Sequence, residues 1–235
     1  VYGSANYYSN AAEIQNDGIE LSLRASVFRN KDFEWVVGGN IAFINSEVKS
    51  LGKLTESIQT LSDGSKIITR VGENPYSFYG PKAIKIFATT AEANEADLIN
   101  PRGDAFGAGD VHFLDNNNDN MIDDKDNVIL GSALPDFFGG FYTSFHYKGW
   151  SLSAEFSYSY GNDAYNAVRR YNESMSTFNN QSTSILNRWQ LEGQITDVPK
   201  AIYGDPIDNS RFSSRWIEDA SFLKIKNVTL SYTIN

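Results

Sequence analysis

The chain has 235 residues, no cysteine and a formal net charge of −9 at pH 7. The length suits one large domain or two small ones, and the lack of cysteine excludes disulfides, thiolate metal sites and cysteine nucleophiles. The negative charge, with no Lys/Arg run longer than Arg169-Arg170, argues against nucleic acid as a partner.

The first predicted elements are two strands. Residues 19–28 and 33–45 alternate between apolar and polar side chains, which is the pattern of a strand with one apolar face. The short polar segment 29–32 separates them, so the sequence predicts a β-hairpin.

A long connection follows, over about residues 49–136. Its polar stretch "TTAEANEADLINP" predicts a short helix, and the acidic stretch "DNNNDNMIDDKD" at 115–126 comes next. Residues 101–136 contain eight aspartates but only two Lys or Arg residues, Arg102 and Lys125. A bound cation would therefore relieve repulsion between the carboxylates.

The acidic stretch has the spacing of a calcium loop. Oxygen ligands at positions 1, 3, 5, 7, 9 and 12 of such a loop can converge on one hard cation, with position 7 contributing its backbone carbonyl. The candidate metal ligands at these positions are Asp115, Asn117, Asp119, Met121, Asp123 and Asp126. Position 6 is Asn120 instead of Gly, and position 12 is the shorter Asp126 instead of Glu. The sequence therefore leaves two interpretations open, a Ca²⁺-binding loop and an empty, solvated turn. No helix pair of the EF-hand kind flanks the loop.

The next two predicted strands are residues 137–147 and 150–160, joined by a tight turn at Lys148-Gly149. Each alternates for about eleven residues, which is long enough to cross the wall of a tilted membrane barrel. The alternation in these strands and in the first two predicts that one set of side chains faces lipid and that another set faces the lumen of the barrel. The lipid set is Leu21, Leu23, Phe141, Phe145, Leu152 and Phe156, and the lumen set is Glu20, Arg24, Ser153 and Glu155.

The second long connection spans about residues 161–221. Asn162 or Asp163 is predicted to cap a helix through Tyr165, Val168 and Tyr171. A further helical turn is expected near 185–189.

The last predicted strand is about 222–234. Its alternation changes phase near Asn227, which predicts a bulge there.

These elements predict an all-β fold, namely part of a large antiparallel transmembrane β-barrel with long extracellular loops that contain short helices. Short turns at one end and long loops at the other are typical of outer-membrane barrels. Five strands are too few to close such a barrel, so the chain is interpreted as a piece of a larger one. The alternative is a soluble, calcium-stabilised β-sandwich that binds carbohydrate.

No enzyme is predicted, because neither a Gly-x-Ser-x-Gly motif nor a phosphate-cradling loop occurs. The pair Glu218/Asp219 is better explained as the start of a strand than as acid–base groups.

Several blocks of the sequence resemble a known family. They are "NDGIELSL", "SFYG", "GDVHFLDNNNDNMIDDKDNVILG", "PDFFGGFYTSFHYKGWSLSAEFSYSYGNDAYN" and "SSRWIEDASFLKIKNVTLSYTI". In order and spacing they resemble the C-terminal barrel region of SusC/RagA-type TonB-dependent outer-membrane transporters of Bacteroidetes.

The resemblance implies that residues 1–235 form the C-terminal part of the barrel, with the plug domain outside them. It also implies an outer-membrane location and import of oligosaccharides or peptides. The implied partners are a SusD-like surface lipoprotein, TonB acting through the plug, and outer-membrane lipid.

Overall fold

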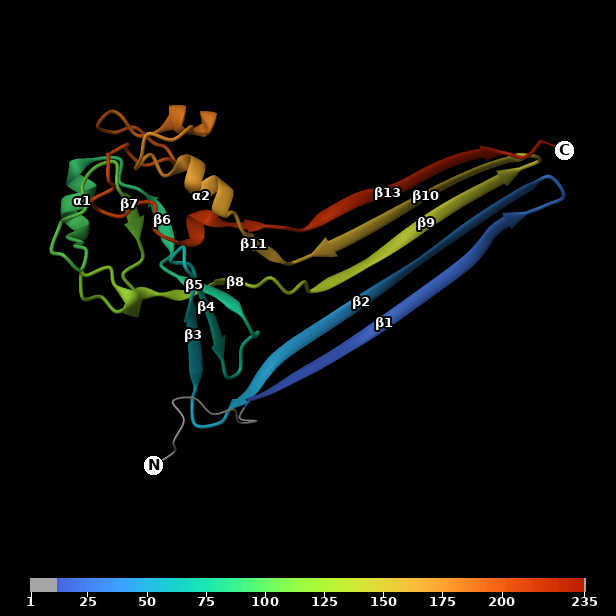
Figure 1. The fold of residues 1–235 in the computed structure, drawn as a ribbon, viewed down its shortest axis with the longest axis horizontal. Coiled ribbons are helices and arrows are strands. Elements are labelled where there is room, and N and C mark those ends of the chain that lie inside the picture. Colours follow the sequence, from blue (N-terminus) through green and yellow to red (C-terminus); the bar gives the residue numbers. More distant parts are fainter. Residues whose placement is uncertain (1–11, 235) are drawn as a thin grey trace.

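A computed structural model describes residues 12–234 of the chain. Its main feature is one antiparallel sheet of five long strands in the order β1-β2-β9-β10-β13, which confirms the all-β prediction (Figure 1). The strands are β1 (Ala12–Arg29), β2 (Phe33–Leu51), β9 (Phe137–Tyr147), β10 (Trp150–Tyr160) and β13 (Phe222–Tyr232). The first two strands extend further towards the loops than their alternation predicts, because residues 12–18 pair with β2 although they are mainly polar.

The two ends of this sheet differ. Tight turns join β1 to β2 and β9 to β10 at the right-hand end of Figure 1, where β13 also ends. Asn30 forms the first turn, since its side-chain oxygen accepts hydrogen bonds from the backbone N–H groups of Asp32 and Phe33. All the other short elements lie at the left-hand end, in the segments that follow β2 and β10.

The predicted bulge lies in β13. Glu155 of β10 pairs with Asn227, whereas its neighbour Phe156 pairs with Ile225, so Lys226 is the extra residue. A bulge shifts the side-chain alternation by one residue. It therefore brings Ile225 and Val228, which are out of phase in the sequence, onto the same face of the sheet.

The sheet has one apolar and one polar face. Cross-strand pairs on the apolar face include Leu21 with Ile41, and Leu23 with Gly39. Aromatic rings stack across the strands on this face, for example Phe141 on Phe156 at a centroid distance of 4.5 Å. Glu20, Arg24, Ser153 and Glu155 lie on the opposite face, as predicted from the alternation.

No second sheet covers the apolar face among residues 12–234. Leu23, for example, exposes 73% of its surface there. A β-sandwich would bury this face against another sheet. The structure therefore argues against the soluble sandwich.

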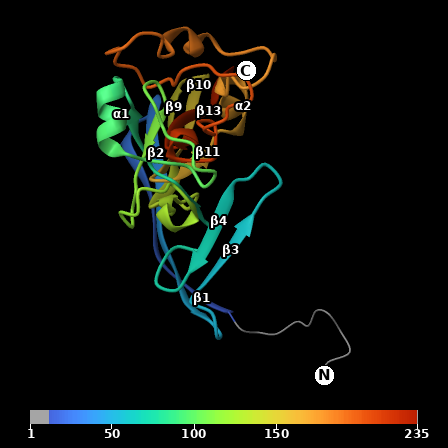
Figure 2. The same ribbon diagram turned by 90° about the vertical axis from the view of Figure 1, so that its left-hand side faces the viewer.

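The loop region is built from short elements in three small sheets and a few helical turns. The sheets have the orders β3-β4-β5-β8, β6-β7 and β11-β12, and the hairpin β3–β4 stands apart from the other loops (Figure 2). After β2 come β3 (Glu56–Thr60), β4 (Lys66–Arg70), β5 (Ser77–Gly80), β6 (Ala83–Ile86), α1 (Thr90–Ala96), β7 (Val111–Phe113), the 3₁₀ turn η1 (Asp124–Asp126) and β8 (Val128–Gly131). After β10 come β11 (Asp163–Tyr165), α2 (Ala167–Glu173), η2 (Thr183–Asn187), η3 (Ser214–Trp216) and β12 (Ile217–Asp219).

The helices lie close to where the sequence predicts them, with one correction. Helix α2 begins after Asn166, whose side chain accepts the backbone N–H of Arg169, so the predicted cap at Asn162 or Asp163 is wrong. Residues 163–165 are instead a strand, because they pair with β12. None of the described helices has the length and apolar character needed to cross a membrane.

A small hydrophobic core and a buried ion pair hold the loop region together. The core includes Phe87, Val111, Phe113 and Ile122. Beside it, the carboxylate of Asp110 accepts hydrogen bonds from Lys200 (2.9 Å) and Asn209 (2.8 Å), and Asp110 is almost fully buried. Because Lys200 and Asn209 belong to the second long loop, these contacts join it to the first.

Candidate functional site in the loop region

The acidic loop at 115–126 is folded by its own carboxylates. Asp115 accepts the backbone N–H groups of Asn118 (2.7 Å) and Asn120 (2.8 Å). Asn120 has a φ of 62°, so it takes the left-handed conformation that glycine usually supplies at this position. Asp126 accepts the N–H groups of Asn116 and Asp123 and is fully buried. It therefore ties the start of the loop to its end.

The predicted metal ligands are near one another in this loop, but a lysine lies among them. The Lys125 ammonium is 3.4 Å from a carboxylate oxygen of Asp119 and 3.5 Å from one of Asp123. Asp115 and Asn117 belong to the same run of turns, whereas Asp126 is turned into the protein. Among residues 12–234, no three His, Cys, Asp or Glu side chains are grouped in an arrangement that could hold a metal ion. Calcium binding stays a prediction.

The pKa of Asp119 is lowered by hydrogen bonds within the loop. The backbone N–H of Met121 lowers this pKa first, and the amide of Asn117 and the ammonium of Lys125 lower it further. These donors stabilise the carboxylate without burying it. The side chain is therefore ionised at neutral pH.

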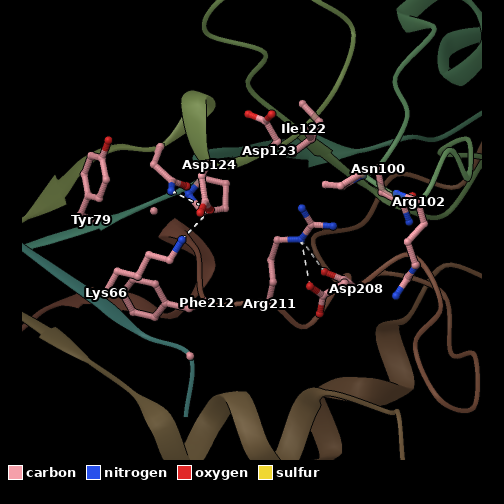
Figure 3. Close-up of a pocket in the computed structure, with 15 residues that line it drawn as sticks. Lys66, Tyr79, Asn100, Arg102, Ile122, Asp123, Asp124, Asp208, Arg211 and Phe212 are labelled. Atoms are coloured by element: carbon pink, nitrogen blue, oxygen red, sulfur yellow. Dashed lines mark hydrogen bonds and ion pairs between the residues drawn. The ribbon is translucent and has the colours of Figure 1, made fainter. Parts of the chain in front are cut away.

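A pocket of about 590 Å³ lies directly beside the acidic loop (Figure 3). Its wall combines four parts of the chain: the ends of β4 and β5, residues 100–102 after α1, residues 122–127 of the acidic loop, and the segment before η3. The labelled residues that line it are Lys66, Tyr79, Asn100, Arg102, Ile122, Asp123, Asp124, Asp208, Arg211 and Phe212. The sequence predicts only Asp123 among these as a site residue, because the others come from segments far apart in the chain.

Charged groups of both signs line the pocket as pairs. Lys66 forms an ion pair with Asp124, and its hydrogen bond lowers the pKa of that carboxyl group. Arg211 lies 3.6 Å from Asp208. The pocket is thus electrically mixed, in contrast to the negative charge of the whole chain.

Arg211 is positioned by the core below the pocket. Its guanidinium lies over the ring of Phe113 at 4.8 Å, and it donates hydrogen bonds to the carbonyls of Ile207 (2.7 Å) and Asp208 (2.8 Å). Burial lowers its pKa, but an arginine remains charged at neutral pH. The arrangement therefore holds a fixed positive charge at the pocket wall.

The pocket has the features of a binding site. Among the described residues that line it, none is a Ser, Cys or His. It offers carboxylate acceptors, guanidinium and ammonium donors and an amide, so it can bind a polar ligand through hydrogen bonds in both directions. Tyr79 and Phe212 contribute little open ring surface, because they are 7% and 5% exposed.

A second cluster surrounds Trp216, in the block "SSRWIED". The fully buried indole lies between the guanidinium groups of Arg215, at 4.7 Å, and Arg169, at 5.8 Å. Burial lowers the pKa of Arg215 to about 10. Arg169 also forms ion pairs with Glu173 (3.1 Å) and Glu218 (2.9 Å). Glu218 thus belongs to a structural network at the start of β12, as the sequence suggests.

The polar face of the long sheet carries a separate hollow of about 780 Å³. Glu20, Arg24, Glu155 and Lys226 contribute charged groups to it. They are arranged on the face that the alternation predicts to line the lumen. The polar face of the sheet therefore carries charged groups of both signs.

Comparison with known proteins gives matches along almost the whole chain. No protein-family model matches it. The TonB-dependent receptor P39 of Formosa agariphila is 27% identical over 99% of the chain, which corresponds to 25% of the receptor. The TonB-dependent receptor SusC of Bacteroides thetaiotaomicron is 25% identical over 98% of the chain and 21% of its own length.

Solved structures agree with these relatives. The RagAB peptide transporter matches with a TM-score of 0.73 and 25% identity, over 96% of this chain and 23% of that one. The 'closed-closed' state of the RagAB peptide importer matches with a TM-score of 0.70 and 27% identity, over the same shares. The chain spans about a quarter of the length of the proteins it matches. The chain is thus similar in sequence to TonB-dependent receptors, SusC among them, and in fold to the RagAB transporter.

Proposed function

We propose that the chain forms wall and outer loops of an outer-membrane transporter that imports nutrients with energy supplied through TonB. The observation that carries this proposal is the long sheet of five membrane-length strands, one face of which carries most of the exposed apolar side chains, such as Leu21, Leu23 and Leu152. Its outer strands β1 and β13 are paired on one side only among the described residues. In lipid such edges need further strands, because every backbone N–H and C=O group there must be paired.

The proposed transporter works with a SusD-like lipoprotein and imports oligosaccharides or peptides. Of the two, the loop pocket favours peptides. Its paired carboxylates and cationic groups complement the charged termini and amides of a peptide. Sugar stacking needs an open aromatic face, and Tyr79 and Phe212 are almost completely covered.

We expect Arg102→Ala to weaken uptake of a peptide nutrient. Arg102 lines the pocket and its side chain is 63% exposed, so its removal takes away a charged donor without opening the core. Loss of one hydrogen bond to a charged group predicts a roughly tenfold lower apparent affinity. The measurement is uptake of labelled peptides and oligosaccharides by cells that carry the intact protein.

Lys31→Ala is the matched control, because Lys31 lies in the turn at the other end of the sheet. Normal peptide uptake by Arg102→Ala at normal protein levels would contradict the pocket assignment. If uptake of oligosaccharides falls and that of peptides does not, the pocket serves glycans instead.

We also propose that the acidic loop binds Ca²⁺. Asp115, Asn117 and Asp119 accept backbone N–H groups in consecutive turns. One oxygen of each, namely Asp115 Oδ2, Asn117 Oδ1 and Asp119 Oδ1, accepts a single hydrogen bond and so retains a lone pair for a cation. The ammonium group of Lys125 lies beside the carboxylates of Asp119 and Asp123, which is consistent with a site that attracts positive charge. A bound divalent ion would stiffen a loop that has little core of its own.

Asp119→Ala is expected to make the loop sensitive to protease, with new cuts between residues 100 and 135 at micromolar to millimolar Ca²⁺. A chelator should have the same effect on the unchanged protein. Asn116→Ala is the control, because position 2 of the loop supplies no predicted ligand. If the chelator leaves the cuts unchanged while Asp119→Ala increases them, Asp119 acts through its hydrogen bonds alone and the calcium proposal is wrong.

A further inference from the structure

The apolar face of the long sheet contains a hollow of about 820 Å³ that the transport proposal does not use. It crosses β1, β2 and β9, and the side chain of Tyr158 reaches it from β10. Its apolar lining includes Leu21, Leu23, Val37, Ile41 and Phe141.

Glycines create this hollow. Gly39 lines it and leaves a gap between Leu23 and Phe141, which are its partners on the two neighbouring strands. One strand further, a Cβ atom on Gly139 would lie only 2.8 Å from the hydroxyl of Tyr158. The bare backbone at 139 therefore lets the Tyr158 ring lie across β9.

The polar atoms at the hollow already have partners within the protein. The indole N–H of Trp35 donates to the hydroxyl of Thr143 at 2.9 Å. The Tyr158 hydroxyl donates to the backbone carbonyl of Asn40 at 3.0 Å. Trp35 also stacks on Phe145, with a centroid distance of 5.6 Å and an interplanar angle of 16°. The indole N–H of Trp35 and the hydroxyl of Tyr158 are thus already paired, so the hollow presents mainly apolar surface, which suits an apolar ligand and disfavours a polar one.

We infer that the hollow is a discrete binding site for one acyl chain of a bilayer phospholipid. The lining from Trp35 to Ile41 runs about 20 Å along β2, which is long enough for most of an extended fatty chain. The volume is in the range of small-molecule sites. This inference rests on the proposed placement of the sheet in a membrane.

A lipid is the occupant that the surroundings favour. Exposed apolar side chains continue from the hollow on both sides, including Ile19 on β1 and Leu152 and Leu230 towards β13. A medium that covers all five strands must therefore also reach the hollow. The bilayer is such a medium, and one of its chains can fill the hollow without breaking the continuity of the face.

Trp35 provides the test, because it lines the proposed site. The intact protein is placed in phospholipid vesicles that contain an increasing fraction of lipid brominated on its acyl chains, and tryptophan quenching is recorded. The contribution of Trp35 is the difference between the unchanged protein and Trp35→Phe. That of Trp150, on the same face at the turn end of β10, is the difference for Trp150→Phe.

We expect Trp35 to reach half-maximal quenching at a roughly tenfold lower fraction of brominated lipid than Trp150, the preference expected from burying about two additional methylene groups. In this experiment the brominated and the ordinary acyl chains compete for the hollow. The unbrominated lipid is therefore chosen with shorter acyl chains, which fill the hollow less completely. Val37→Phe narrows the hollow and should remove this preference. Ala154→Leu adds a similar volume on the same face outside the hollow and should retain it.

Each other outcome has a defined meaning. Equal half-points for Trp35 and Trp150 would show that the hollow binds lipid like any other part of the surface, and would overturn the inference while leaving the membrane placement intact. Quenching of Trp150 without quenching of Trp35 would show that a protein segment or a second copy fills the hollow, which also overturns it. If neither tryptophan is quenched, the membrane placement itself fails.

Discussion

Trp216→Ala is expected to destabilise the loop region by about 3–5 kcal/mol, the usual cost of removing a large buried aromatic side chain. Trp216 is fully buried, and its indole N–H donates to the carbonyl of Arg211 at 2.9 Å. The substitution would leave a cavity between Arg215 and Arg169. It would also make the segment that places Arg211 at the pocket wall more mobile.

The loss should be local in the first instance. Limited proteolysis of the intact protein should show earlier cuts between residues 161 and 221, and thermal unfolding should show a lower first transition. Tyr171→Ala is the matched control, because Tyr171 is an aromatic residue of α2 in the same loop and is 61% exposed. An unchanged cut pattern for Trp216→Ala would contradict the structural role assigned to the indole.

The long strands are predictable from the sequence because their signal is local. A strand with one apolar face repeats every two residues, so residues 137–160 indicate both strands and their turn without reference to the rest of the chain. The phase change at Asn227 indicates the bulge in the same way. What alternation does not predict is the extension of β1 to Ala12, since mainly polar residues there are paired without presenting an apolar face.

The pocket is not predictable in this way, because its lining depends on contacts over long distances in the chain. Lys66 and Asp124 are 58 residues apart. Arg211 is held by Phe113, which lies in the other long loop. No spacing rule joins such residues. The acidic loop is detectable because its residues form one turn-rich run, yet the sequence does not show that the Lys125 ammonium contacts the carboxylates of Asp119 and Asp123.

The misplaced helix cap has a similar cause. Asn162, Asp163 and Asn166 are all suitable caps by residue type. Pairing of residues 163–165 with β12, more than fifty residues further along the chain, decides among them. The local preference for a cap is weaker than this strand pairing, so the helix begins only at Ala167.

The second large effect is expected for a charge on the apolar face. Ala154→Arg places a guanidinium near the middle of β10 on the face assigned to lipid, where an arginine costs about 2–4 kcal/mol in a membrane barrel. Ala154 is small and takes no part in the aromatic stacking on this face. The cost should therefore reflect the transfer of charge into lipid and not the loss of packing.

Ser153→Arg is the control, because Ser153 lies next to Ala154 but on the opposite, polar face of the same strand, which it shares with Glu155. We expect it to change the free energy of unfolding by less than about 1 kcal/mol, since lumen positions tolerate charge. Denaturant unfolding of the intact protein in lipid vesicles measures both variants. If both lose the same stability, the two faces share one environment. Alternation along the strand would then not separate lipid from lumen, and the barrel placement would have to be abandoned.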